Sequence, residues 1–129
     1  MLNKKWKILI VEDDEAICNA MQFCLKNEKY RVIVARDGEE GLILANKQMP
    51  DLILLDLILP KINGFEFLKR LRNDKKINQL PVMVFSNLSQ KEDVDQAKEY
   101  GVIDFFVKAN ITTNDLTEIV NKYFNQKKI

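Results

Sequence analysis

The feature that most constrains the fold is an apolar run, Leu52 to Leu55, that leads into a single carboxylate, Asp56. The run does not alternate with polar residues, which is typical of a strand buried on both faces inside a parallel sheet. Pro60 and Gly64 then mark a turn. Asp56 would therefore stand at the carboxyl end of a central strand, the edge at which open α/β sheets bind ligands. An aspartate that only caps a turn is the alternative at this point.

Strand-like and helix-like patterns alternate through the rest of the chain. Five such βα units in series predict a doubly wound α/β fold, with a five-stranded parallel sheet and five helices on its two faces. We expect strands at Lys7–Val11, Tyr30–Ala35, 52–55, Val82–Phe85 and Asp104–Val107, and helices at Glu15–Lys26, Gly38–Lys47, Phe65–Asn73, Glu92–Tyr100 and Asp115–Gln126.

The helical patterns also predict which side chains face the sheet. The helix Glu92–Tyr100 offers little to bury beyond Val94 and Ala97, and Gly101 is placed to end it. The last helix has its N-cap at Thr112, Thr113 or Asn114. The expected inner faces are Ile17, Ala20, Met21 and Cys24 in the first helix, Leu42, Ala45 and Met49 in the second, Phe67, Leu68 and Leu71 in the third, and Leu116, Ile119, Val120, Tyr123 and Phe124 in the last.

Length and charge limit the classes of protein that fit. The 129 residues suit one domain, with a core over about 6–126, and we expect no linker and no effector domain. Twenty basic and nineteen acidic side chains nearly balance, so nothing favours binding to nucleic acid or to an anionic membrane. The first residues form neither a signal peptide nor a membrane span.

The absence of histidine and the positions of the two cysteines exclude several kinds of catalytic site, metal site and disulfide. Without histidine the chain has neither imidazole acid–base catalysis nor imidazole metal sites. Cys18 and Cys24 lie six apart on one expected helix, on different faces, so they should not form a disulfide. They also lack metal-ligand spacing. We expect them to be packing residues of a protein in the reducing cytoplasm.

Polar side chains follow four of the five expected strands, and parallel strands end at one edge of a sheet. Carboxylates gathered there would raise one another's pKa, and a divalent cation would relieve their repulsion. Oxygen ligands without histidine or cysteine favour Mg²⁺. A hydroxyl and an ammonium beside them make a place for phosphoryl oxygens. Singly, each residue could be a helix cap, a turn residue or a solvated strand end. The residues are Glu12, Asp13, Asp56, Ser86 and Lys108.

Four segments carry a family resemblance: "ILIVEDD", "LILLDLILPKINGFEFLKRLR", "VMVFSN" and "DFFVK". Together with the Asp-x₃-Pro-x₃-Gly pattern at Asp56, and with Lys108 22 residues beyond Ser86, they resemble the receiver domain of two-component response regulators, the CheY-like family. The similarity covers essentially the whole chain. It implies a flavodoxin-like fold with strand order 2-1-3-4-5.

The resemblance also implies a role for each site residue. Asp56 corresponds to the phosphoacceptor, and Ser86 and Lys108 to the residues that bind phosphoryl oxygens. Asp13 would bind Mg²⁺ directly and Glu12 through water, and Mn²⁺ is expected to substitute. The remaining assignments are the Ile58 backbone carbonyl as a metal ligand, Asp14 as a helix cap, Ser86 and Phe105 as switch residues, and Ile58 and Leu88 as residues that set the lifetime of the acylphosphate.

The sequence departs from the family pattern at three positions. Phe105 lacks the hydroxyl of the tyrosine found in many receivers, and Asn87 replaces a small residue. Ala109 stands where the family has a proline joined by a cis bond. A cis bond before a residue other than proline costs roughly 2.5–4 kcal/mol, so we expect the Lys108–Ala109 bond to be trans and the following loop to take a different path.

The implied function is that of a stand-alone receiver, which is not an enzyme beyond catalysing its own phosphorylation and dephosphorylation. A sensor histidine kinase or a phosphotransfer protein would donate the phosphoryl group. The region Glu92–Gln126 would then change its surface for a protein partner, and the receiver would be a monomer or a weak phosphorylation-dependent dimer.

Three other classes fit less well. A haloacid-dehalogenase-like phosphatase needs an aspartate two residues after the nucleophile, where this chain has Ile58. A flavodoxin-like cofactor binder needs a phosphate-binding loop, and Glu12-Asp13-Asp14 would repel a phosphate. A phosphorylation-independent scaffold is disfavoured because no essential receiver residue is missing.

Overall fold

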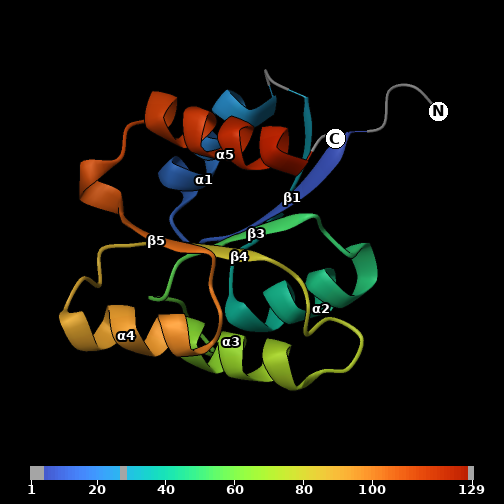
Figure 1. The fold of residues 1–129 in the computed structure, drawn as a ribbon, viewed down its shortest axis with the longest axis vertical. Helices are drawn as coiled ribbons and strands as arrows, with labels where there is room; N and C mark the ends of the chain where they lie inside the picture. The colour runs from blue at the N-terminus through green and yellow to red at the C-terminus, as the bar shows by residue number, and fades with distance from the viewer. Residues whose placement is uncertain (1–4, 27–28, 128–129) are drawn as a thin grey trace.

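The computed structural model describes residues 5–26 and 29–127, and the predicted alternation of strands and helices is confirmed there (Figure 1). A short 3₁₀ turn, η1 (Lys108–Asn110), was not predicted. The strands are β1 (Trp6–Val11), β2 (Tyr30–Ala35), β3 (Leu52–Leu55), β4 (Val82–Ser86) and β5 (Asp104–Val107), and the helices are α1 (Glu15–Lys26), α2 (Gly38–Gln48), α3 (Gly64–Asn73), α4 (Lys91–Glu99) and α5 (Thr113–Lys127).

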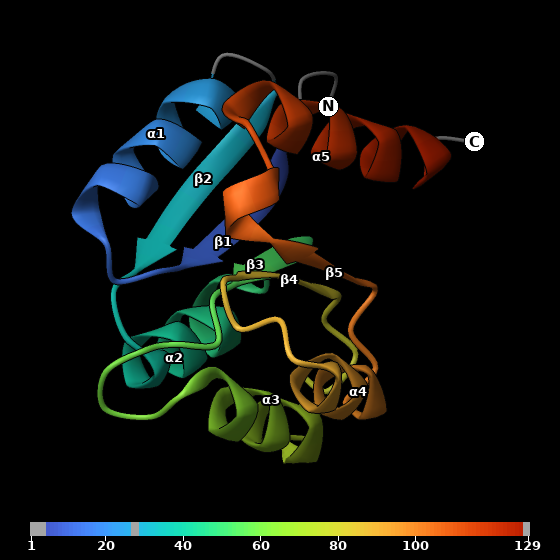
Figure 2. The same ribbon diagram turned by 90° about the vertical axis from the view of Figure 1, so that its left-hand side faces the viewer.

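All five strands are parallel, in the order β2-β1-β3-β4-β5, as the resemblance implied. Helices α1 and α5 cover one face of the sheet, and α2, α3 and α4 cover the other, which both views show (Figures 1 and 2). The carboxyl ends of the strands therefore share one edge, between the two helical layers.

The apolar run Leu52–Leu55 forms β3, at the centre of the core. All four residues of β3 are buried. Leu52 and Leu54 belong to the cluster beneath α1 and α5, whereas Ile53 and Leu55 belong to the cluster beneath α2, α3 and α4. Successive side chains of a strand point to opposite faces, so an unbroken run is required where both faces are covered.

The predicted inner face of α1 is confirmed for Met21, which is buried, and for Ile17 and Cys24, which are partly buried against the cluster beneath α1 and α5. It is wrong for Ala20. The buried residues are Cys18, Met21 and Leu25, while Ala20 is exposed. Cys18 and Leu25, on the neighbouring stripe, are fully buried as well, so the buried face is centred closer to these residues than the i, i+3, i+4 pattern predicted. The two cysteines are free thiols, as expected.

Met49 was also wrongly placed on an inner face. It is 42% exposed and lies in the left-handed region at φ 49°, where it ends α2. Its amide still donates to the Ala45 carbonyl, four residues earlier, and the left-handed backbone at Met49 then ends the helix. The buried residues of α2 are small: Gly38, Gly41 and Ala45.

Two predicted helix ends are confirmed. Gly101 follows α4 at φ 73°, a conformation that favours glycine. Thr112 is the N-cap of α5: its hydroxyl accepts from the Asp115 amide, and the Asp115 carboxylate accepts from the Thr112 amide. Within residues 5–26 and 29–127, no helix is long and apolar enough to cross a membrane.

Candidate functional site

The structure brings three carboxylates together at the carboxyl edge of the sheet. Glu12, Asp13 and Asp56 each place an oxygen within 4.8 Å of the others. Strand pairing causes this convergence, because the Glu12 amide donates to the Ala35 carbonyl and the Asp56 amide to the Val11 carbonyl, both at 3.0 Å. Glu12 and Asp56 are thus the first residues beyond neighbouring strands.

The turn after Asp56 explains the spacing of Asp56 and Gly64. The Gly64 amide donates to the Leu57 carbonyl at 2.8 Å, which closes the β3–α3 loop. A Cβ at Gly64 would lie 2.5 Å from the Cα of Leu57, so the helix can approach the strand end this closely only with glycine. The glycine therefore allows α3 to start directly behind Asp56.

Glu12 and Asp56 are buried, at 3% and 6% exposure, whereas Asp13 is exposed. Each buried carboxylate accepts a hydrogen bond from the amide two residues further on: Glu12 from Asp14 at 3.1 Å and Asp56 from Ile58 at 3.2 Å. These amide donors were not predicted, although an aspartate before a turn commonly accepts such a bond.

Lys108 joins the buried carboxylates. Its Nζ lies 2.8 Å from Asp56 Oδ2 and also forms an ion pair with Glu12 Oε1. Burial opposes the charge of the ammonium, but hydrogen bonds to Asp56 and Glu12 outweigh it and raise the pKa of Lys108. Burial raises the pKa of Glu12, and the hydrogen bond from Lys108 offsets this only in part. Repulsion from Asp56 also raises the pKa of Glu12, as expected, but it is the smallest of the causes.

Ser86 is fully buried at the end of β4, and its Oγ accepts from the Leu88 amide at 3.3 Å. Leu88 and Phe105 are half-buried and pack against the core cluster beneath α2, α3 and α4. Ile58 is 54% exposed beside Asp56.

The Asp14 carboxylate accepts from the Ile17 amide at 2.9 Å, so Asp14 caps α1 as predicted.

The loop after Lys108 follows the path of the unpredicted 3₁₀ turn. No peptide bond in the described part of the chain is cis, so the bond between Lys108 and Ala109 is trans as expected. The Ala109 amide donates to Asn87 Oδ1 at 3.0 Å, a contact that the sequence analysis did not foresee.

The donor set fits a hard divalent cation. Three carboxylates surround the position, and one ammonium neutralises only one of them, which leaves two negative charges unbalanced. Oxygen donors of this kind suit Mg²⁺ or Mn²⁺.

Comparisons with known proteins agree with this geometry. Residues 8–121 match the family model described as the response regulator receiver domain. The fold and the site define a receiver of two-component signalling, and the chain belongs to the response regulator receiver family. Receivers are signalling modules rather than enzymes; they bind a divalent metal at an acidic site and imply a histidine kinase as donor.

Individual relatives are similar over most of this chain. The transcriptional regulatory protein AfsQ1 of Streptomyces coelicolor is 41% identical over 101 residues, which cover 78% of this chain and 44% of AfsQ1. The chain thus spans less than half the length of this relative. The phosphorylated cyanobacterial phytochrome response regulator RcpA is 31% identical with a TM-score of 0.79, covering 93% of this chain and 91% of RcpA. The Mn²⁺-bound form of response regulator Rcp1 is 31% identical with a TM-score of 0.74, covering 89% and 88%.

Proposed function

We propose that a histidine kinase or a phosphotransfer protein transfers a phosphoryl group to Asp56. The observation that carries this proposal is the placing of Asp56 between Lys108, 2.8 Å away, and the carboxylates of Glu12 and Asp13. A carboxylate oxygen of Asp56 would form the new O–P bond while the P–N bond to the donor histidine breaks. The displaced imidazole nitrogen remains on the donor.

Glu12, Asp13 and Asp56, with the backbone carbonyl of Ile58, would hold Mg²⁺, for which Mn²⁺ can substitute. In this assignment Asp13 binds the metal directly and Glu12 through water. When bound, the ion supplies positive charge that stabilises the transferring phosphoryl oxygens. Lys108 would release a carboxylate and anchor a phosphoryl oxygen instead, since its ammonium already lies beside Asp56.

The signal would leave the site through Ser86. Its Oγ now accepts from the Leu88 amide and would turn to donate to a phosphoryl oxygen. That turn would loosen Leu88 and Phe105, which pack on the same cluster beneath α2, α3 and α4. The surface of α4, β5 and α5 would then change for a protein partner.

Intact mass after incubation with acetyl phosphate and Mg²⁺ tests the phosphoacceptor. We expect the wild type to gain one phosphoryl group, and Asp56→Asn to gain none. Asp14→Asn is the matched control, because asparagine keeps the helix cap and the variant should be modified like the wild type. Modification of Asp56→Asn, or modification that EDTA does not reduce, would contradict the assignment.

Lys108→Ala separates phosphorylation from the response. We expect this variant to be phosphorylated still, since the carboxylates and the metal remain. The chemical shifts of Glu92–Gln126 should respond to beryllofluoride much less than in the wild type, because the ammonium that anchors the phosphoryl oxygen is gone. A full wild-type shift pattern would contradict this role.

Ile58 and Leu88 should make the acylphosphate long-lived, because neither side chain offers a donor or acceptor that would hold the hydrolytic water. Exposed apolar residues with no such role are the alternative. The variant Ile58→Asn with Leu88→Glu should lose its phosphate faster, by up to about 10²-fold. A decay time course that matches the wild type would show that these side chains do not set the lifetime.

A further inference from the structure

A side chain continues the contact between β4 and β5 where their backbone pairing stops. The strands stay in register up to Ser86 and Val107. Beyond them residues 108–110 turn into η1, so the regular ladder does not extend. The Asn87 carboxamide bridges the gap, because its Oδ1 accepts from the Ala109 amide at 3.0 Å.

This hydrogen bond acts on the peptide unit that follows Lys108. The Ala109 N–H and the Lys108 carbonyl belong to the same planar peptide. The carbonyl is held as well, since it accepts from the Ile111 amide at 3.1 Å. Asn87 and Ile111 thus hold the two polar ends of one peptide plane and fix the backbone from which the Lys108 side chain starts.

The Lys108 side chain must reach a defined place from that backbone. Its ammonium pairs with Asp56 Oδ2 at 2.8 Å and with Glu12 Oε1, at the ends of two other strands. Lysine has a long, flexible stem, so its direction of entry depends on where its backbone is held. Asn87 itself is exposed and contacts Ala109 rather than the carboxylates.

We propose that Asn87 is a positioning residue for Lys108, acting through the Ala109 amide. The consequence for phosphoryl binding rests on the function proposed above, whereas the effect on Lys108 itself does not. Because small misplacements of a charged group weaken its action on a reacting centre, loss of the carboxamide should weaken binding of a phosphoryl mimic.

Three variants test this role. Asn87→Ala removes the acceptor, and Asn87→Asp keeps an acceptor oxygen at the same distance from the backbone. Asn110→Ala is the matched control: it makes the same truncation in η1, beside Ala109, and within residues 5–26 and 29–127 the Asn110 side chain has no hydrogen bond. Hydrogen exchange of the Ala109 amide and relaxation of the Lys108 side-chain methylenes are measured by NMR on metal-free protein. Affinity for beryllofluoride is measured separately with Mg²⁺.

We expect Asn87→Ala to speed exchange of the Ala109 amide, to loosen the Lys108 methylenes and to weaken beryllofluoride binding by about threefold to tenfold, the range of one hydrogen bond. Asn87→Asp should restore the amide protection and the order of Lys108, and Asn110→Ala should change none of the three. Unchanged Lys108 relaxation in Asn87→Ala would overturn the proposal. If the wild type failed to bind beryllofluoride, the proposed function would be contradicted, while loosening of Lys108 by Asn87→Ala would still support the positioning role.

Discussion

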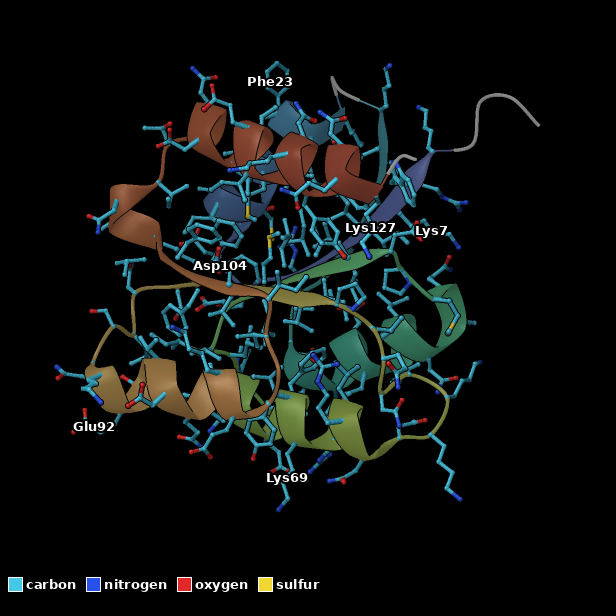
Figure 3. All side chains as sticks on the ribbon, in the orientation of Figure 1. Lys7, Phe23, Lys69, Glu92, Asp104 and Lys127 are labelled. Atoms are coloured by element: carbon cyan, nitrogen blue, oxygen red, sulfur yellow. The ribbon has the colours of Figure 1, made fainter. Side chains whose placement is uncertain are left out.

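Helices α3 and α4 lie side by side on the same face of the sheet, yet they are held very differently (Figure 1). Helix α3 buries Phe67, Leu68 and Leu71, whereas the only buried residue of α4 is Ala97. Lys69 and Glu92 point away from the sheet on the solvent sides of these helices (Figure 3). Since shallow burial lowers local stability, α4 is the element of the pair that a change at the site can displace at small cost.

The two ends of α4 also differ. At its C-terminal end, the Arg72 guanidinium of α3 donates to the carbonyls of Tyr100 at 2.6 Å and Leu80 at 2.7 Å, and burial lowers the pKa of Arg72. At its N-terminal end, Gln90 makes no side-chain cap. The end of α4 without a side-chain cap is the one that follows Ser86 and Leu88, so the proposed movement of Ser86 would reach the weaker end first.

The largest expected difference between the helices is in core truncations. Leu71→Ala in α3 should lower the free energy of unfolding by about 2–5 kcal/mol, because the side chain is fully buried. Val94→Ala in α4 should lower it by about 1 kcal/mol or less, because Val94 is only half-buried. Urea denaturation measures both. Equal losses would remove the basis for treating α4 as the weaker element.

The next effect concerns the hydrogen bonds from Arg72 of α3 to the carbonyl groups at the C-terminal end of α4 and before β4. Arg72→Met should lower the free energy of unfolding by about 1.5–3 kcal/mol, since it removes charged, partly buried hydrogen bonds to the carbonyls of Tyr100, Asn78 and Leu80. Arg70→Met is the matched control two residues earlier: within the described part of the chain Arg70 pairs only with Glu66, on the exposed side of α3, so little should change. Hydrogen exchange at Tyr100 and Gly101 should accelerate in the first variant alone. If both variants behaved alike, Arg72 would not anchor the end of α4.

The smallest effect is at the helix starts. The Asn63 side chain accepts from the Glu66 amide at 3.0 Å, so Asn63→Ala should cost about 1 kcal/mol. Gln90→Ala removes no cap and should be close to neutral. Gln90→Asp should instead stabilise the protein by about 0.5–1 kcal/mol by supplying the missing cap. Thermal unfolding of the three variants compares the caps, and a cost at Gln90→Ala as large as at Asn63→Ala would contradict the account.

The parallel sheet and the convergence of the polar residues at one of its edges could be predicted from the sequence, because both follow from strong local patterns. The unbroken run of β3 specified a central strand, and parallel strands necessarily deliver Glu12, Asp56 and Lys108 to one edge. The deep burial of Cys18 and the exposure of Ala20 in α1 were not predictable in the same way, since Ile17 and Cys18 both begin an apolar stripe and only packing decides how deeply each is buried.

The contact between Asn87 and Ala109 lay beyond sequence reasoning for a different reason. The two residues were recognised as separate departures from the family pattern, 22 positions apart. Their contact depends on the path of η1, and that turn follows from the packing of two loops rather than from a local pattern. A polar side chain that satisfies a backbone amide is visible only once the backbone is placed.

The most direct test of the account is a comparison of amide chemical shifts in α3 and α4 when beryllofluoride and Mg²⁺ are added. The account predicts large changes in residues 91–99, beginning at the N-terminal end of α4, and small changes in residues 64–73. No such changes should occur in Asp56→Asn. Shifts of equal size in both helices, or a response that survives in Asp56→Asn, would contradict the claim that a phosphoryl group on Asp56 acts through the weakly held helix.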